Sequence, residues 1–148
     1  MDEFKGKLKL LTLYLLSKSK MHGYLVMKKL EELLGYKPYP GAIYPILGGL
    51  RREGLIRISE EREEGRRAKV YEITDKGEEF LKQRSEELRK ALEMASCLRY
   101  FSEMGGRELM SVVKDVVRAL PEMDREARAE VSSTIKAFVR DLRKILGR

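Results

Sequence analysis

The sequence predicts a mostly α-helical protein with one small β-hairpin. Several segments place apolar residues every three or four positions, which is the spacing of amphipathic helices. Two short segments rich in Ile, Val and Tyr flank a charged turn, which is typical of a hairpin. A late run of apolar residues has the spacing of a coiled coil. The sequence therefore predicts a helical protein whose sheet is confined to one place.

The composition narrows the class of protein. Of 148 residues, 43% are hydrophobic and 37% are charged, so the chain can bury a core and must expose an ionic surface. The formal net charge of +7 favours polyanionic partners. The longest apolar stretch, residues 10–16, is too short to cross a membrane, and the acidic start is unlike a signal peptide. We therefore expect a cytoplasmic protein that does not bind membranes.

Three helices are predicted in the first part of the chain. They are expected over residues 4–15, 22–35 and 40–52. Gly35 is typical of the end of a helix, and Pro40 is favourable at the first position of the next one. The third helix should turn four apolar side chains inward and end at Gly54. Those side chains are Ile43, Ile46, Leu47 and Leu50.

A hairpin and a fourth helix should follow. Residues 55–60 and 69–73 predict two short strands joined by a long charged loop that contains Gly65. Thr74 or Asp75 is expected to cap the fourth helix, because Asp75 and Glu78 fit the spacing of a capping box. Three helices followed by a hairpin make the winged helix-turn-helix arrangement, which we assign to residues 1–85.

Residues 86–148 are predicted to form helices that join two copies of the chain. The fourth helix should continue to about Met104 and break at residues 105–106, and a further helix should end at Pro121. Asp124 is expected to cap the last helix. That helix carries an apolar seam at alternating spacings of four and three residues, and such a seam has to be buried against another helix. The seam consists of Val131, Ile135, Phe138, Leu142 and Ile145.

Four short motifs occur in order along the first half of the chain. They are Met-His-Gly-Tyr at 21–24, Pro-Gly-Ala-Ile-Tyr-Pro-Ile-Leu at 40–47, Arg-Glu-Gly-Leu-Ile at 52–56, and the segment from Gly65 to Gly77. Together they resemble the PadR-type transcriptional regulators, over about residues 8–81. The resemblance implies a winged-helix DNA-binding domain followed by dimerising helices. It also implies a repressor, which in some members is released from DNA by a small molecule.

The third helix departs from the family pattern. Tyr39 and Ala42 stand where the family usually has Ser or Thr beside Gly41, and residues 48–49 are glycines where a basic pair often occurs. The helix also lacks Asn and Gln, the usual bidentate partners of adenine. We therefore expect sequence discrimination to rest on Ala42, Tyr39, backbone groups and DNA shape.

The predicted DNA contacts come from the second helix, the third helix and the hairpin. Backbone N–H groups near Gly41 can approach a phosphate, and Tyr44 either binds a phosphate or fills space between helix and hairpin. The arginines of the hairpin either reach the minor groove or pair with neighbouring glutamates. Two copies would meet successive major grooves of a palindromic operator. The predicted contact residues are Lys20, Tyr24, Lys28, Tyr39, Gly41, Ala42, Tyr44, Arg66, Arg67 and Lys69.

The residues give little reason to expect an enzyme. With one His and one Cys, no catalytic group, metal site or cofactor is predicted. His22 is expected to cap a helix or to pack as a ring, and Cys97 to fill a small space in the core. The methionines of the C-terminal half either line a pocket for a small apolar effector or fill gaps. The alternative function is a protein-interaction module without specific operator binding.

Overall fold

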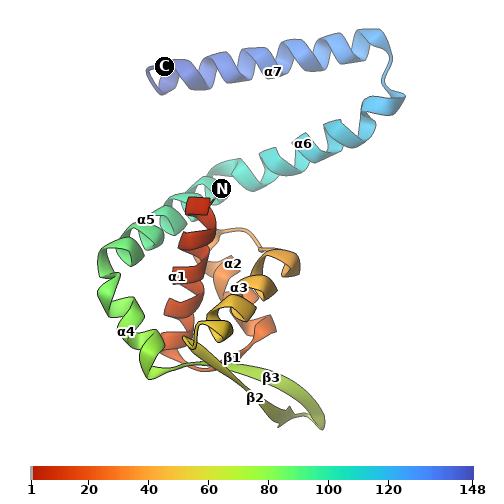
Figure 1. The fold of residues 1–148 in the computed structure, drawn as a ribbon. Helices are drawn as coiled ribbons and strands as arrows, with labels where there is room; N and C mark the ends of the chain where they lie inside the picture. Colours follow the sequence, from red (N-terminus) through yellow and green to blue (C-terminus); the bar gives the residue numbers. More distant parts are fainter. Residues whose placement is uncertain (1) are drawn as a thin grey trace. The chain divides into compact units, whose positions relative to one another are not determined.

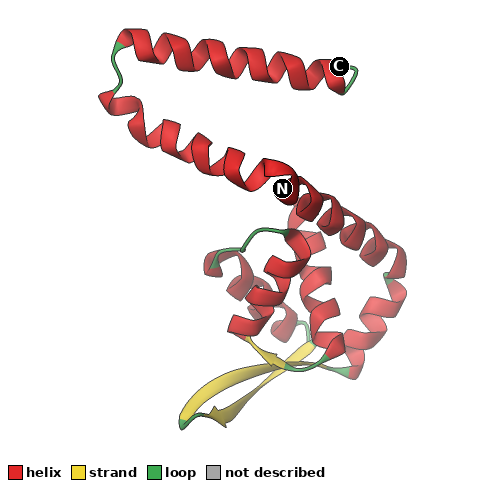
Figure 2. Ribbon diagram, turned by 180° about the vertical axis from the view of Figure 1, so that it is seen from behind, coloured by secondary structure: helices red, strands yellow, loops and turns green. Residues whose placement is uncertain are grey.

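The computed structural model describes residues 2–148, which are mostly helical with one small sheet, as predicted (Figures 1 and 2). The chain divides into two compact units, Met1–Arg107 and Glu108–Arg148. The elements in chain order are α1 (Asp2–Lys18), β1 (Met21–His22), α2 (Gly23–Leu34), α3 (Pro40–Arg52), β2 (Ile56–Glu63), β3 (Arg66–Ile73), α4 (Asp75–Gln83), α5 (Ser85–Phe101), the π-helical turn Ser102–Gly106, α6 (Arg107–Ala119), the 3-10 turn Leu120–Glu122 and α7 (Arg125–Ile145).

The core of the first unit lies among α1, α2 and α3. Helix α3 begins at Pro40 and ends at Arg52, as predicted, and buries Ile43, Leu47 and Leu50. Helix α2 ends at Gly35, whose φ of 77° is the left-handed conformation that glycine adopts readily. These helices support one another because each turns an apolar stripe toward the same centre.

Helix α5 also belongs to the first unit. Ala91 and Ala95 are almost completely buried, at 0% and 1% exposure, and α5 packs against α1 and α2. Small side chains at these positions let the helix backbone approach α1 closely. The compact unit therefore extends past residue 85 to Arg107.

The sheet is antiparallel, with strand order β1-β3-β2. The predicted long hairpin loop is wrong, because β2 and β3 each have 8 residues and continue to the two-residue turn Glu64–Gly65. Both turn residues have positive φ, 50° for Glu64 and 77° for Gly65, which matches the twist of a tight hairpin. The short strand β1, which pairs with β3, was not predicted.

Helices α4 and α5 differ from the single helix that the sequence suggested. The helix breaks at Arg84, where φ is −116° and ψ is 32°. Thr74, not Asp75, caps α4: its hydroxyl accepts a hydrogen bond from the Gly77 amide at 3.1 Å, so the Asp75–Glu78 capping box does not form. Cys97 is exposed, which contradicts its expected place in the core. The predicted break at residues 105–106 is present, with a φ of 111° at Gly105.

The second unit consists of α6 and α7 joined by a 3-10 turn. Asp124 caps α7 as predicted, with its carboxylate accepting from the Ala127 amide at 2.8 Å. Arg128 donates to the carbonyl of Leu120 at 2.8 Å and so fixes the turn. Neither α6 nor α7 buries a side chain completely. Within residues 2–148, no helix has both the length and the apolar character needed to cross a membrane.

Candidate nucleic-acid interface

The start of α3 is open to an anion. Pro40 occupies the first turn, Tyr39 makes no side-chain cap, and the first turn of this fully described helix contains no acidic residue. The positive end of the helix dipole is therefore not neutralised by a nearby carboxylate. Gly41 lies against the Tyr39 ring, because an added Cβ would be 2.9 Å from Cε2 of that ring. The Tyr39 side chain itself is 70% exposed.

Tyr44 lies between α3 and the sheet. A Cβ added to Gly23 would be 3.1 Å from the Tyr44 hydroxyl and 3.4 Å from the ring of Tyr71, so the two tyrosines meet above Gly23. Burial raises the pKa of Tyr71. Tyr44 remains 47% exposed. Its ring therefore fills space between helix and hairpin while part of it stays accessible to a ligand.

A groove of about 400 Å³ separates α3 from the hairpin β2–β3, which we call the wing. Its lining includes the basic residues Arg51, Arg52 and Lys69 and no acidic residue. The Arg52 guanidinium lies over the glycine pair, with Nη1 at 3.4 Å from the position of a Cβ on Gly48. Arg51 and Arg52 are not among the contacts predicted from the sequence. The i, i+4 and i+7 spacing of residues 44, 48 and 51 is the signal that could have found this lining.

The two faces of the wing differ in charge. Side chains alternate between the faces along each strand, and paired residues share a face. The inner face, which borders the groove, carries Glu60, Arg62, Arg67 and Lys69 toward its tip. The outer face carries Glu61, Glu63, Arg66 and Ala68. Basic side chains therefore outnumber acidic ones on the inner face, whereas acidic side chains outnumber basic ones on the outer face.

The two glutamates of the outer face are paired with basic side chains that precede α2. The Lys20 ammonium lies 2.7 Å from the Glu61 carboxylate, and this hydrogen bond raises the pKa of Lys20. Nε2 of His22 lies 2.7 Å from the Glu63 carboxylate, and its Nδ1 lies 3.2 Å from the carbonyl of Lys69. His22 occupies the N-cap position of α2 but makes no cap with its side chain. Of its two expected roles, the packed ring is the one found.

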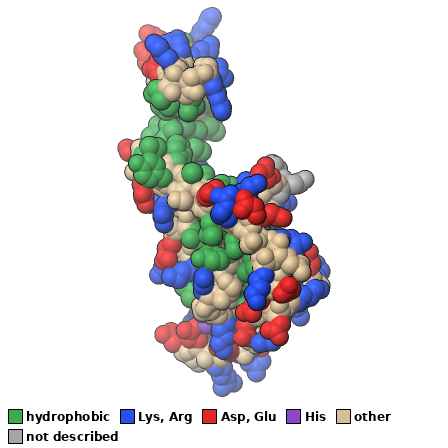
Figure 3. Space-filling model, turned by 90° about the vertical axis from the view of Figure 1, so that its left-hand side faces the viewer, with side chains coloured by type: hydrophobic (Ala, Val, Ile, Leu, Met, Phe, Trp, Pro, Cys, Tyr) green, Lys and Arg blue, Asp and Glu red, His purple; other side chains and the backbone are tan. Residues whose placement is uncertain are grey.

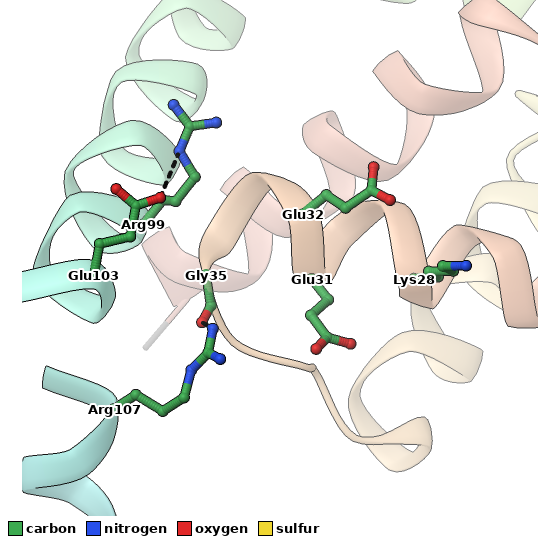
Figure 4. A pocket seen from close by; sticks show the side chains of 7 residues that line it. All are labelled: Lys28, Glu31, Glu32, Gly35, Arg99, Glu103 and Arg107. Carbon is green, nitrogen blue, oxygen red and sulfur yellow. Dashed lines mark hydrogen bonds and ion pairs between the residues drawn. The ribbon is translucent and has the colours of Figure 1, made fainter. Parts of the chain in front are cut away.

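The remaining predicted contacts are not part of the groove lining. Ala42 lies in the first turn of α3, half-buried, and Tyr24 is 70% exposed on α2. Lys28 lines a different hollow, beside Glu31 and Glu32 at the end of α2 (Figure 4). There the Arg107 guanidinium donates to the Gly35 carbonyl at 2.8 Å. The structure thus brings Tyr44 and Lys69 together at the groove, and it places Lys28 at another hollow.

The predicted seam of α7 is exposed in the single chain. Ile135, Phe138, Leu142 and Ile145 are 52%, 43%, 42% and 81% exposed, and Val131 is half-buried. Helix α6 exposes further apolar side chains, which are Met110, Val112, Val113 and Val117. Figure 3 shows hydrophobic side chains gathered on the second unit, in the upper part of the view. Apolar surface of this extent is typical of an interaction site.

No cluster of three or more His, Cys, Asp or Glu side chains that could hold a metal ion occurs within the described residues 2–148.

Comparison with known proteins indicates regulators of transcription. The sequence model of the family described as "Transcriptional regulator PadR-like family" matches residues 12–83. Transcriptional regulator YqjI of Escherichia coli is 38% identical over 85 residues, which cover 56% of this chain and 40% of that protein. The chain thus spans about two fifths of the length of this curated relative.

Solved structures match over a longer part of the chain. A protein from Thermoplasma acidophilum, described as a candidate transcriptional regulator, is 31% identical, with a TM-score of 0.55 over 66% of this chain and 93% of that one. A PadR-like transcriptional regulator from Bacillus cereus is 26% identical, with a TM-score of 0.51 over 84% of this chain and 100% of that one.

Proposed function

Because the chain belongs to the PadR-like family of transcriptional regulators, we propose that it binds double-stranded DNA as a homodimer and represses transcription. Residues 1–85 supply the DNA-binding part, and residues 86–148 supply the dimerising helices. The protein acts in the cytoplasm as a regulator and not as an enzyme.

The observation that carries this proposal is the cationic groove between α3 and the wing. It joins Arg51 and Arg52 of the helix to Lys69 of the wing, with no acidic side chain in its lining. An uncapped helix start lies on the same helix. Phosphates bind both to basic side chains and to helix N-termini, so the two features suit a duplex backbone. Helix α3 would enter the major groove and the inner face of the wing would follow the flanking phosphates.

The DNA-contact set extends the predicted one. Tyr39, Gly41, Ala42 and Tyr44 of α3, Arg67 and Lys69 of the wing, and Tyr24 of α2 are the proposed contacts, together with Arg51 and Arg52. Arg66 lies on the outer face and is expected to contribute less to DNA binding than Arg67. Lys28 is a peripheral contact, since it borders a hollow with acidic neighbours. The Lys20 ammonium is already paired with the Glu61 carboxylate, at 2.7 Å.

Sequence selectivity in this proposal comes from few base contacts. The outward residues of α3 include Gly41, Pro45 and Gly48, which have no polar side-chain group. Ala42 and Tyr39 can contact thymine methyl groups and sugars, and the remainder is read as DNA shape. Selection from a random duplex pool should therefore return a short, loosely defined half-site. A long and sharply defined half-site would contradict this part of the proposal.

Dimerisation is supported by the exposed seam on α7. A homodimer related by twofold symmetry would present two copies of α3 to one duplex, and this predicts a palindromic operator with half-sites about one helical turn apart. A small apolar effector would bind among the methionines of the C-terminal half. Met110 of α6 is 50% exposed in the single chain, so a second copy is needed to enclose such a ligand.

A titration with duplex DNA tests the function. Fluorescence anisotropy would compare a duplex from the promoter upstream of the protein's own gene with a scrambled duplex of equal length. We expect tighter binding to the promoter, and a logarithm of affinity that falls linearly with the logarithm of salt concentration between about 50 and 200 mM. Weak binding that ignores sequence would favour the protein-interaction module, and no binding at low salt would refute the proposal.

A further inference from the structure

The outer face of the wing presents a problem for a DNA-binding hairpin. Glu61 and Glu63 lie near the tip, where a phosphate backbone would repel them. Both carboxylates, however, are paired with basic side chains from the segment just before α2. Lys20 lies 2.7 Å from Glu61, and His22 lies 2.7 Å from Glu63. The same two contacts join the wing to the helix-turn-helix. They therefore compensate the acidic charge and hold the hairpin in place at the same time.

The surroundings of the His22 ring distinguish between its protonation states. Nε2 faces a carboxylate at 2.7 Å and Nδ1 faces a backbone carbonyl at 3.2 Å, and both partners are hydrogen-bond acceptors. A neutral imidazole has one N–H and can satisfy only one acceptor, whereas the imidazolium ion has two. Only the charged ring makes both contacts as hydrogen bonds. The wing is thus tied at Glu63 and at Lys69 when the ring is protonated.

We propose that His22 is a positioning residue for the wing, and that its protonation strengthens the binding of DNA. This inference rests on the proposed function. When the ring loses its proton, one of its two hydrogen bonds is lost, and the Glu63 carboxylate no longer has a charged imidazole at 2.7 Å. The hairpin is then less well fixed, and its tip repels the phosphate backbone. Affinity for DNA should accordingly fall as pH rises.

The charged groups around the ring come from β2, from β3 and from the segment before β1. Glu63 contacts it from β2, where Glu61 lies on the same face of the wing, Arg66 and Lys69 belong to β3, and Lys20 precedes it by two residues in the sequence. Glutamates ordinarily lose their proton near pH 4 and lysines and arginines stay charged above pH 10, whereas histidine ordinarily changes charge between about pH 5 and 8. Among these side-chain types, histidine is therefore the one that ordinarily changes charge in that window.

The test measures DNA affinity against pH in the full chain. We expect affinity to fall about two- to fivefold between about pH 6 and pH 8, the size of one exposed ion pair. His22 is the single histidine of the sequence, so His22→Gln should abolish this pH dependence. Glu63→Gln should reduce it, since it removes the carboxylate partner. Glu60→Gln on the inner face is the matched control and should retain it.

A second measurement separates this inference from the proposed function. Nuclear Overhauser contacts of the His22 ring with Glu63 and with Lys69 should both be strong near pH 6, and one of the two should be weak near pH 8, in protein without DNA. If no duplex binds at any pH, the proposed function fails, while these contacts still test the positioning role. Contacts that are unchanged across the range, or a pH dependence of affinity that persists in His22→Gln, would overturn the inference.

Discussion

Gly77 in the first turn of α4 lies directly against the backbone of Leu55 at the start of the wing. A Cβ added to Gly77 would be 2.1 Å from the Leu55 carbonyl oxygen and 2.7 Å from Cγ1 of Ile73. The same carbonyl accepts a hydrogen bond from the Thr74 amide at 3.0 Å. This contact sets the place where the wing meets the helical core, because neither partner is a flexible side chain.

Gly77→Ala should strongly destabilise the protein. The Leu55 carbonyl cannot move without losing its bond to Thr74, so we expect a loss of about 3 kcal/mol in the free energy of unfolding. Urea denaturation followed by circular dichroism measures it. Gly48→Ala is the matched control: its Cβ meets only the end of the flexible Arg52 side chain at 3.4 Å. It should stabilise α3 by up to about 1 kcal/mol. Equal stabilities for the two variants would show that the contact is unimportant.

Thr74→Ala should also destabilise the junction, but less. The Thr74 hydroxyl accepts from the Gly77 amide at 3.1 Å and donates to the Gly54 carbonyl at 2.7 Å. Losing the helix cap costs about 1–2 kcal/mol of unfolding free energy. Thr74→Ser keeps the hydroxyl and should stay near the wild-type stability in the same denaturation experiment. A serine variant as unstable as the alanine variant would assign the effect to the methyl group instead.

The helical core could be predicted from the sequence because its signals are local. Apolar spacing located α1, α2 and α3, and Pro40, Gly35 and Asp124 marked helix ends that the structure contains. Each of these residues acts through its own backbone preference or cap, which does not depend on distant parts of the chain.

The errors arose where distant contacts decide the structure. The break at Arg84 has no Gly or Pro; its guanidinium stacks on the Phe80 ring, 3.7 Å from the centroid, while α4 and α5 pack on different parts of the core. The wing strands were predicted too short because both faces near the tip are charged, which hides the alternation of a half-buried strand. The exposure of Cys97 follows from Ala91 and Ala95 forming the buried side of α5.

The candidate site was predictable in its residues more than in its geometry. Basic and aromatic side chains near Gly41 and in the wing stand out in the sequence. Their distribution between the two wing faces depends on the register of β2 with β3, which sequence spacing alone did not give. The pairing of His22 with Glu63 likewise joins residues from different elements.

The wing faces predict different effects for two neighbouring arginines. Arg67 is on the inner face and Arg66 on the outer face. Arg67→Ala should weaken binding to all duplexes alike and lower the salt slope by about one. Arg66→Ala should change the slope less, although it removes the same charge. Anisotropy titrations at several salt concentrations measure both, and equal slopes for the two variants would contradict the assignment of faces.

The seam of α7 predicts how the oligomer can be disrupted. Phe138 and Leu142 are 43% and 42% exposed in the single chain. Replacing both with Glu would place charges in an apolar interface, which is unfavourable because buried charges lose their hydration. We expect the double variant to sediment as a monomer. Its affinity for a palindromic duplex should fall by far more than its affinity for a single half-site, since the variant does not alter the winged-helix unit.

Ser132→Glu and Ser133→Glu, which add the same charge outside the seam, should leave the dimer intact. A double variant that still sediments as a dimer would mean that the protomers join through other residues.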